Sequence, residues 1–164
     1  YPAWVYAIVA IALTIGLRLE RELEGGKSVT LQTTLLTGSV KGEETDFGPS
    51  EPAWDFFGIS LTAAYRKYFN GAVSEGIYVA PAISLGYSSV SRDANEYFSS
   101  AKASATSISA LAFLGYRGKW DGATLFVDLG LGRSFVSVSG DDDAEGVSGS
   151  GLAVDLNLGV GIPF

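Results

Sequence analysis

The sequence predicts an all-β protein: an eight-stranded antiparallel up-and-down transmembrane β-barrel, formed as one domain by residues 1–164. Three observations lead to this prediction. Apolar residues recur at every second position in one segment after another, which is the period of a β-strand. The connections between these segments alternate between short and long, as they do in transmembrane barrels. The chain has a positive mean hydropathy of +0.24, yet no run reaches the roughly 18–20 apolar residues of a spanning helix.

The composition excludes several classes of function. Charged residues make up only 18% of the chain and the net charge is −7, which argues against nucleic-acid binding. Cysteine and histidine are both absent. There is therefore no disulfide, no zinc site of the usual kind and no serine–histidine–acid triad. The lysines fall at predicted strand ends or in connections, so a serine–lysine pair is not favoured either, and we expect no enzyme and no cofactor.

Residues 1–16 are apolar at both odd and even positions, and they are the hardest part of the chain to interpret. The core of a signal peptide and a short N-terminal helix or plug are alternatives. We expect instead that residues 1–12 supply the first strand, because barrels of this kind have an even number of strands.

Seven further segments alternate clearly, and we predict a strand in each. Pro81 removes a ladder donor, so it should stand at a bulge or a weakly paired position. The predicted strands are residues 13–22, 28–40, 54–69, 76–90, 104–117, 123–139 and 151–164. The predicted connections are short at residues 24–27, 70–75 and 118–122, and long at residues 41–53, 91–103 and 140–150.

The last predicted strand shows the alternation most fully. Every second residue from Leu152 to Phe164 is apolar, and the residues between them are small or polar. The other strands follow the same rule, and their polar positions hold mostly Gly, Ala, Ser and Thr. A water-facing surface would be rich in Lys, Glu and Asp, so these positions fit a crowded barrel interior better. A soluble lipocalin-like barrel, with its apolar face inward, is the alternative.

Aromatic residues near the strand ends on the apolar face predict girdles at the two membrane interfaces, where amphipathic rings are favoured. They are Tyr65, Phe69, Tyr116, Trp120, Phe135 and Phe164.

The polar face also carries isolated charged and amide side chains. An eight-stranded barrel is just filled by its side chains, and charges in such a space must pair and keep their hydrogen bonds. We therefore expect a salt-bridge network that closes the interior, with Asp155 bonded to an arginine. A gate or a proton path is the alternative. The network is predicted from Arg18, Glu20, Arg66, Arg117, Asp128, Asp155 and Asn157.

Two features of the predicted loops are weaker candidates for sites. The carboxylates Asp141, Asp142, Asp143 and Glu145 could attract calcium, but their spacing is not that of an EF-hand, and a solvated acidic loop is favoured. Aromatic residues of the long loops could contact a partner or lipopolysaccharide, or anchor the upper girdle, which is favoured. These are Phe47, Trp54, Tyr97 and Phe98.

Several stretches occur in an order that resembles a family. They are IGLRLEREL (15–23), FGISLTAAYRKYF (57–69), GIYVAPAISLGYSSV (76–90), FLGYRGKW (113–120), LFVDLGLGRSF (125–135) and the final Phe164. Together they resemble a family of small, largely uncharacterised bacterial outer-membrane β-barrel proteins, similar to outer-membrane proteins A and W.

The resemblance implies a bacterial outer-membrane location, an eight-stranded barrel and no catalytic residues. It also implies that the last strand, with its terminal aromatic residue, is the signal for the outer-membrane assembly machinery. The expected partners are the lipid bilayer and lipopolysaccharide, and the expected state is a monomer. The predicted function is a structural or surface-interaction role with a plugged lumen. Transport or binding of a small solute is the alternative.

Overall fold

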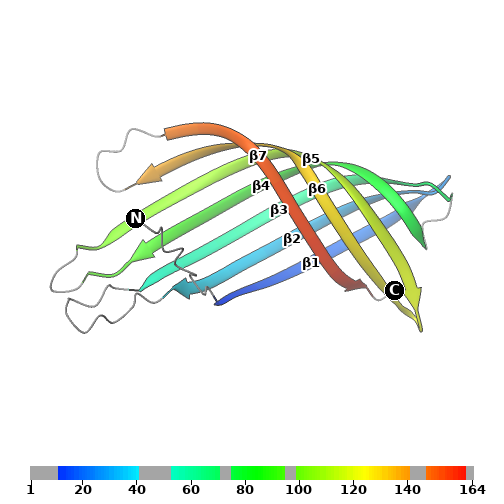
Figure 1. Ribbon diagram of the computed structural model, residues 1–164, viewed down its shortest axis with the longest axis horizontal. Coiled ribbons are helices and arrows are strands. Elements are labelled where there is room, and N and C mark those ends of the chain that lie inside the picture. The colour runs from blue at the N-terminus through cyan, green and yellow to red at the C-terminus, as the bar shows by residue number, and fades with distance from the viewer. Residues whose placement is uncertain (1–10, 41–52, 71–74, 95–98, 141–146, 162–164) are drawn as a thin grey trace, which may run out of the picture.

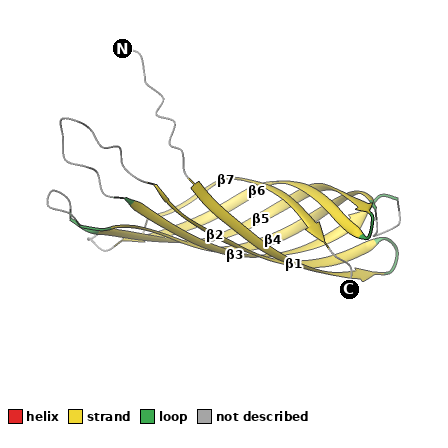
Figure 2. Cartoon of the chain, turned by 90° about the horizontal axis from the view of Figure 1, so that it is seen from below, coloured by secondary structure: helices red, strands yellow, loops and turns green. Residues whose placement is uncertain are grey.

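The computed structural model describes residues 11–40, 53–70, 75–94, 99–140 and 147–161. In these ranges the chain is built of β-strands and turns (Figure 2), and no helix there is long and apolar enough to cross a membrane. The strands are β1 (Ile11–Leu23), β2 (Lys27–Val40), β3 (Trp54–Tyr68), β4 (Gly76–Arg92), β5 (Ala101–Trp120), β6 (Ala123–Gly140) and β7 (Val147–Gly161).

The seven strands form one sheet in which each strand pairs antiparallel with the next along the chain. The all-β class and the antiparallel order are confirmed. The sheet is not closed over the described residues, because β1 and β7 each pair on one side only. The predicted first strand, residues 1–12, lies outside the described residues apart from residues 11 and 12, which begin β1.

The sheet coils strongly, so that β7 crosses in front of other strands in Figure 1. Side chains bridge the interior between the two ends of the sheet. Gln32 of β2 donates a hydrogen bond to Asn157 of β7, with Nε2 and Oδ1 3.0 Å apart. Arg18 of β1 forms an ion pair with Asp128 of β6. β1 and β2 therefore lie across the interior from β6 and β7.

The alternation of the sequence separates the two faces of the sheet. Leu17 and Leu158 on the outer face are 67% and 74% exposed, whereas Tyr78 and Asp128 on the inner face are 0% and 2% exposed. The small inner core contains aromatic rings and alanines, surrounded by polar groups. The distribution is thus the reverse of that in a water-soluble protein, with large apolar side chains outside and charged ones inside.

Tight turns lie at one end of the sheet, which we call the short-turn end. Gly25 and Gly26 join β1 to β2 with φ of 74° and 68°, and Asp121 and Gly122 join β5 to β6 with φ of 45° and 83°. Asp121 and Gly122 form a two-residue loop between the paired residues Trp120 and Ala123, as in the type I′ hairpin turn, which matches the twist of the strands. The opposite end of the sheet is called the far end below.

Several strands extend beyond their predicted bounds, so those predictions were wrong at their edges. β5 begins at Ala101 and ends at Trp120, and β7 begins at Val147. Most of these additional residues are serine, alanine or glycine, which carry no apolar signal. The hydrogen-bonded ladder continues through them, as in the pairs Val90–Ala103 and Ser137–Ser148.

Glycines on the inner face make room for aromatic rings of the preceding strand. Tyr78 lies opposite Gly115 and Phe113 lies opposite Gly130. The same arrangement joins β6 to β7 through Phe126 and Gly159. A Cβ atom at any of the three glycines would overlap the ring it faces. Each ring therefore lies over a bare stretch of neighbouring backbone.

Candidate functional site

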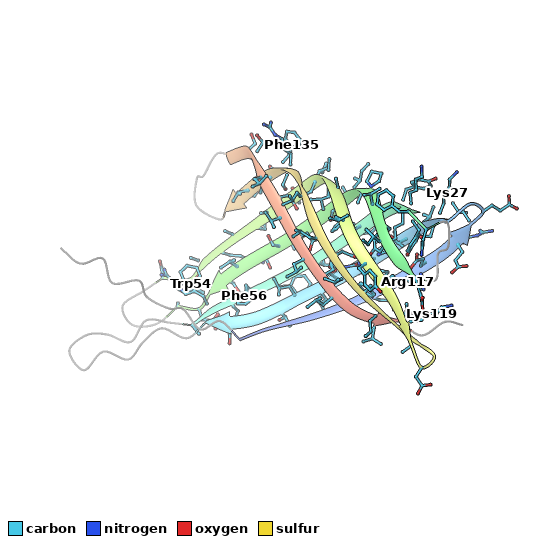
Figure 3. The ribbon with its side chains drawn as sticks, turned by 45° about the vertical axis from the view of Figure 1, so that its right-hand side comes forward. Lys27, Trp54, Phe56, Arg117, Lys119 and Phe135 are labelled. Atoms are coloured by element: carbon cyan, nitrogen blue, oxygen red, sulfur yellow. The ribbon has the colours of Figure 1, made fainter. Side chains whose placement is uncertain are left out.

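The candidate site is a group of charged side chains inside the coiled sheet, toward the short-turn end. We call it the interior cluster, and it comprises Arg18, Glu20, Arg66, Arg117 and Asp128. Figure 3 shows Lys27, Arg117 and Lys119 toward this end, with Trp54 and Phe56 toward the far end. The cluster joins strands that are distant in the sequence, because the coil of the sheet brings the inner faces of β1, β3, β5 and β6 together.

Asp128 is the first of two acceptors in the cluster. Its Oδ2 lies 2.6 Å from Nη2 of Arg18 and 3.4 Å from Nη2 of Arg66. Its Oδ1 accepts a hydrogen bond from the hydroxyl of Tyr78. Asp128, Arg66 and Tyr78 are almost completely buried. Both oxygens of a carboxylate shielded from water are therefore engaged, as a buried charge requires.

Glu20 is the second acceptor. Its Oε2 lies 3.0 Å from Nη1 of Arg66 and 3.0 Å from Nη1 of Arg117. Its Oε1 accepts hydrogen bonds from Ser28 at 2.5 Å and from Tyr68 at 3.2 Å. The Arg117 contact is an ion pair without hydrogen-bond geometry. Arg66 connects the two carboxylates, since it bonds to Glu20 through one nitrogen and to Asp128 through the other.

Neutral side chains extend the cluster across the interior. Nε of Arg18 donates to Oε1 of Gln32 at 2.7 Å, and Gln32 donates in turn to Asn157. The guanidinium of Arg18 also lies 3.9 Å from the ring centre of Phe126, and that of Arg66 lies 4.5 Å from the ring centre of Tyr78. Aromatic faces stabilise cations most where water is excluded, so the arginines are held by rings as well as by carboxylates.

The interior is nearly filled at the level of the cluster. A cavity of about 10 Å³ remains there, bordered by Arg18, Arg66, Asp128, Asp155 and Asn157 among others. This is about the smallest space that can hold one water molecule. The described side chains therefore leave room for about one water molecule in this cavity.

The predicted site residues are brought together with one exception. Asp155 borders the cavity, but no cation of the described residues lies within 4.0 Å of its carboxylate. The expected bond between Asp155 and an arginine is therefore not formed. Asp155 lies opposite Gly130 on β6, whereas Arg18 and Arg66 both reach Asp128. Two carboxylates thus pair with three arginines, and Nη1 of Arg18 is buried without a hydrogen-bond partner among the described residues.

Sequence reasoning did not include four uncharged members of the network in the site. They share the inner face with the charges but carry no charge themselves, and they are Ser28, Gln32, Tyr68 and Tyr78. A signal was present for Tyr78, because a large ring on a face of small residues needs a glycine opposite it. Gly115 meets that need.

The predicted girdle aromatics that the structure describes lie on the outer face. Tyr65, Tyr116 and Phe135 are exposed, and so is Phe69, just beyond β3; Figure 3 shows Phe135 pointing away from the sheet. Trp120 ends β5, but its side chain, like Phe164, lies outside the described part of the structure.

The weaker loop candidates are mostly outside the described residues. These are Phe47, Tyr97, Phe98, the three aspartates Asp141, Asp142 and Asp143, and Glu145. Trp54 is described at the start of β3, where the guanidinium of Arg92 lies 5.0 Å from its ring centre. Across the described part of the chain, no three acidic residues are grouped so that they could hold a metal ion.

Comparison of the chain with protein-family models, with curated proteins and with solved structures finds no match. The family suggested by the motifs of the sequence therefore stays a prediction.

Proposed function

We propose that this chain is an integral β-barrel of a bacterial outer membrane, with a structural or surface-interaction role and no catalytic activity. In this proposal the interior cluster plugs the lumen, and the loops at the far end face the cell exterior. The last strand and Phe164 direct assembly by the outer-membrane machinery, and the barrel works as a monomer.

The observation that carries the proposal is the apolar outer face. In β7 alone, Leu152, Val154, Leu156, Leu158 and Val160 are each at least 63% exposed. Comparable rows occupy the outer faces of the other strands. Soluble monomers rarely expose a contiguous apolar patch of more than a few hundred Å². A bilayer is the solvent that makes such a surface favourable, and roughly 25 cal/mol is gained per Å² of apolar surface removed from water.

Closure of the barrel by an eighth strand belongs to the same proposal. A sheet edge in lipid would leave backbone groups unsatisfied, so a spanning sheet has to close. Each edge strand already contacts the opposite end of the sheet through its inner face: Arg18 of β1 bonds to Asp128 of β6, and Asn157 of β7 accepts from Gln32 of β2. We place residues 1–10 between these edges, because they are apolar and directly precede β1.

The interior supports the plugged lumen over the alternative of solute transport. A transport barrel needs a path or a pocket through its interior, whereas the cavity beside Asp128 has room for about one water molecule. The cluster also has the features of a structural network: its carboxylates accept from several donors each, and its members come from different strands.

A matched pair of lysine substitutions on β7 tests the proposal. Leu156 lies in the middle of the apolar row and Ser148 lies near its far end. A lysine facing lipid costs about 2–4 kcal/mol at the midplane and about 0–1 kcal/mol near the interface. We therefore expect L156K to fold poorly into phosphatidylcholine vesicles and S148K to fold like the wild type.

The measurement is migration on a gel before and after heating, because a folded barrel migrates faster than the unfolded chain. A wild-type chain that is monomeric in water without detergent, and an L156K variant that folds equally well there, would contradict the membrane barrel and favour a soluble one.

A further inference from the structure

One charged residue interrupts the apolar outer face within the row of β6. Arg133 lies between Leu131 and Phe135 on that face, and its cross-strand neighbours are Ala110 and Leu152. Its side chain is exposed. None of the ion pairs among the described residues includes Arg133. A cation in such a place needs an anion from outside the chain or access to water.

The surface beside Arg133 is hollowed. A cavity of about 450 Å³ opens on the outside of β5, β6 and β7 at the far end. Ile108 and Phe135 supply its apolar lining, and both are more than half exposed. The volume falls within the range of small-molecule sites, roughly 300–1,000 Å³. The polar lining consists of hydroxyl groups, from Thr106, Ser137, Ser148 and Ser150.

The strand register orders these groups along the barrel wall. Successive rows across β5, β6 and β7 are Ala112–Leu131–Val154, then Ala110–Arg133–Leu152, then Ile108–Phe135–Ser150 and Thr106–Ser137–Ser148. The surface therefore changes from apolar to hydroxyl-bearing over a few residues, and Arg133 lies one row before the mixed row of Ile108, Phe135 and Ser150. A glycolipid presents partners for all three kinds of group: acyl chains, a charged phosphate and sugar hydroxyls.

We propose that Arg133 and the adjacent hollow bind the head of a phosphorylated glycolipid from the outer leaflet. The proposal rests on the membrane barrel proposed above. The planar guanidinium of Arg133 binds the phosphate, for which its fork of donors is suited. The hydroxyls of the hollow bond to the sugar, and the acyl chains lie along Leu131, Leu152 and Val154. A sugar fits this lining better than an ethanolamine or glycerol head, because it offers several hydroxyls to a row of hydroxyl partners.

The test uses the full chain folded in detergent micelles and bisphosphorylated lipid A as the probe, with bound lipid counted by native mass spectrometry. We expect one lipid A per chain and at least a tenfold loss of affinity in R133Q. The matched control is K67Q, which removes an outward cation at the short-turn end, on β3; it should bind as the wild type does. S137A with S148A should weaken binding of lipid A but not of phosphatidylglycerol.

Three results would overturn the inference. They are equal binding by R133Q and the wild type, equal competition by phosphatidylglycerol, and occupation of the hollow by a second copy of the chain, seen as a dimer that R133Q dissociates. Folding is checked on the same samples by the heat-dependent gel shift. If the chain shows the heat-dependent gel shift but fails these lipid tests, this inference alone is contradicted. If the chain does not show the gel shift, the membrane barrel and this inference are both contradicted.

Discussion

At the scale of single residues, Asp128 is the more deeply buried of the two carboxylates of the interior cluster. It accepts from Arg18, Arg66 and Tyr78, and its side chain is 3% exposed. Buried ion pairs contribute little net stability compared with apolar packing, but removal of one partner is costly because the other charge stays buried. The loss of stability caused by a substitution therefore depends on whether it leaves a buried charge without its ion-pair partner.

The first prediction follows from that asymmetry. D128A should lower the free energy of unfolding by about 3–5 kcal/mol, because it leaves two buried arginines short of an acceptor. D155A removes a carboxylate of the same interior that has no ion pair, so it should cost about 1 kcal/mol or less. Urea unfolding in lipid vesicles, followed by tryptophan fluorescence, measures both variants. Equal losses for the two would show that the ion pairs of Asp128 do not stabilise the fold.

At the scale of elements, the face of each strand could be predicted from the sequence, whereas the exact ends could not. Residues such as Leu61 and Arg66 reveal their faces because the strand period is two, and tertiary packing does not alter that period. The ends of β5 and β7 lie among serines, alanines and glycines, where hydropathy does not alternate clearly between successive residues. Their extent depends on pairing with a neighbouring strand.

The same reasoning explains which site contacts could be predicted. Odd and even positions of a strand point to opposite faces, so the sequence predicts which charged side chains point into the interior. These include Arg18, Glu20, Arg66 and Asp128. Which carboxylate each arginine reaches depends on the coil of the sheet and on side-chain length. The coil of the sheet cannot be obtained from the alternation of the sequence, and for that reason the partner of Asp155 was predicted wrongly.

A second prediction at this scale concerns the edges of the sheet. The chain has no cysteine, so any disulfide that forms must join the introduced cysteines. Single cysteines at residues 3–9, each combined with L156C, should form a disulfide at the position opposite residue 156, and more weakly two residues to either side, but not at the positions between, if residues 1–10 pair with β7. Alternation is expected because neighbouring strands share faces at every second residue. Efficient cross-linking of L19C on β1 with L156C would instead indicate that β1 and β7 pair directly.

At the scale of the whole molecule, the interior differs between its two ends. Toward the short-turn end it is filled by the cluster and by the rings of Tyr68 and Tyr78, whose centres are 4.9 Å apart. Toward the far end the inner face carries partly exposed side chains, including Phe56 and Val90. The described interior is therefore closed at one end and more open at the other, which suits a surface role better than a through-channel.

Electrical recording tests this closure. The wild-type chain in planar bilayers should give no stable single-channel steps, because the cluster leaves room for about one water molecule. The double variant R18A with D128A removes both residues of the Arg18–Asp128 ion pair, so neither is left as an unpaired charge. This variant should increase the ion leak. Reproducible steps from the wild type would contradict the plugged lumen and favour the transport alternative.

The aromatic rings that lie over glycines also bear on how the strands find their partners. A slip of two residues between β4 and β5 preserves every inward and outward side chain, so hydrophobicity alone does not oppose it. That slip would bring Tyr78 opposite Phe113 or Arg117 instead of Gly115, and the ring would have no space. Steric conflict of this kind penalises mispaired hairpins before the barrel is complete. Tyr78, Phe113 and Phe126 would thus act as checks on assembly as well as fillers of the finished interior.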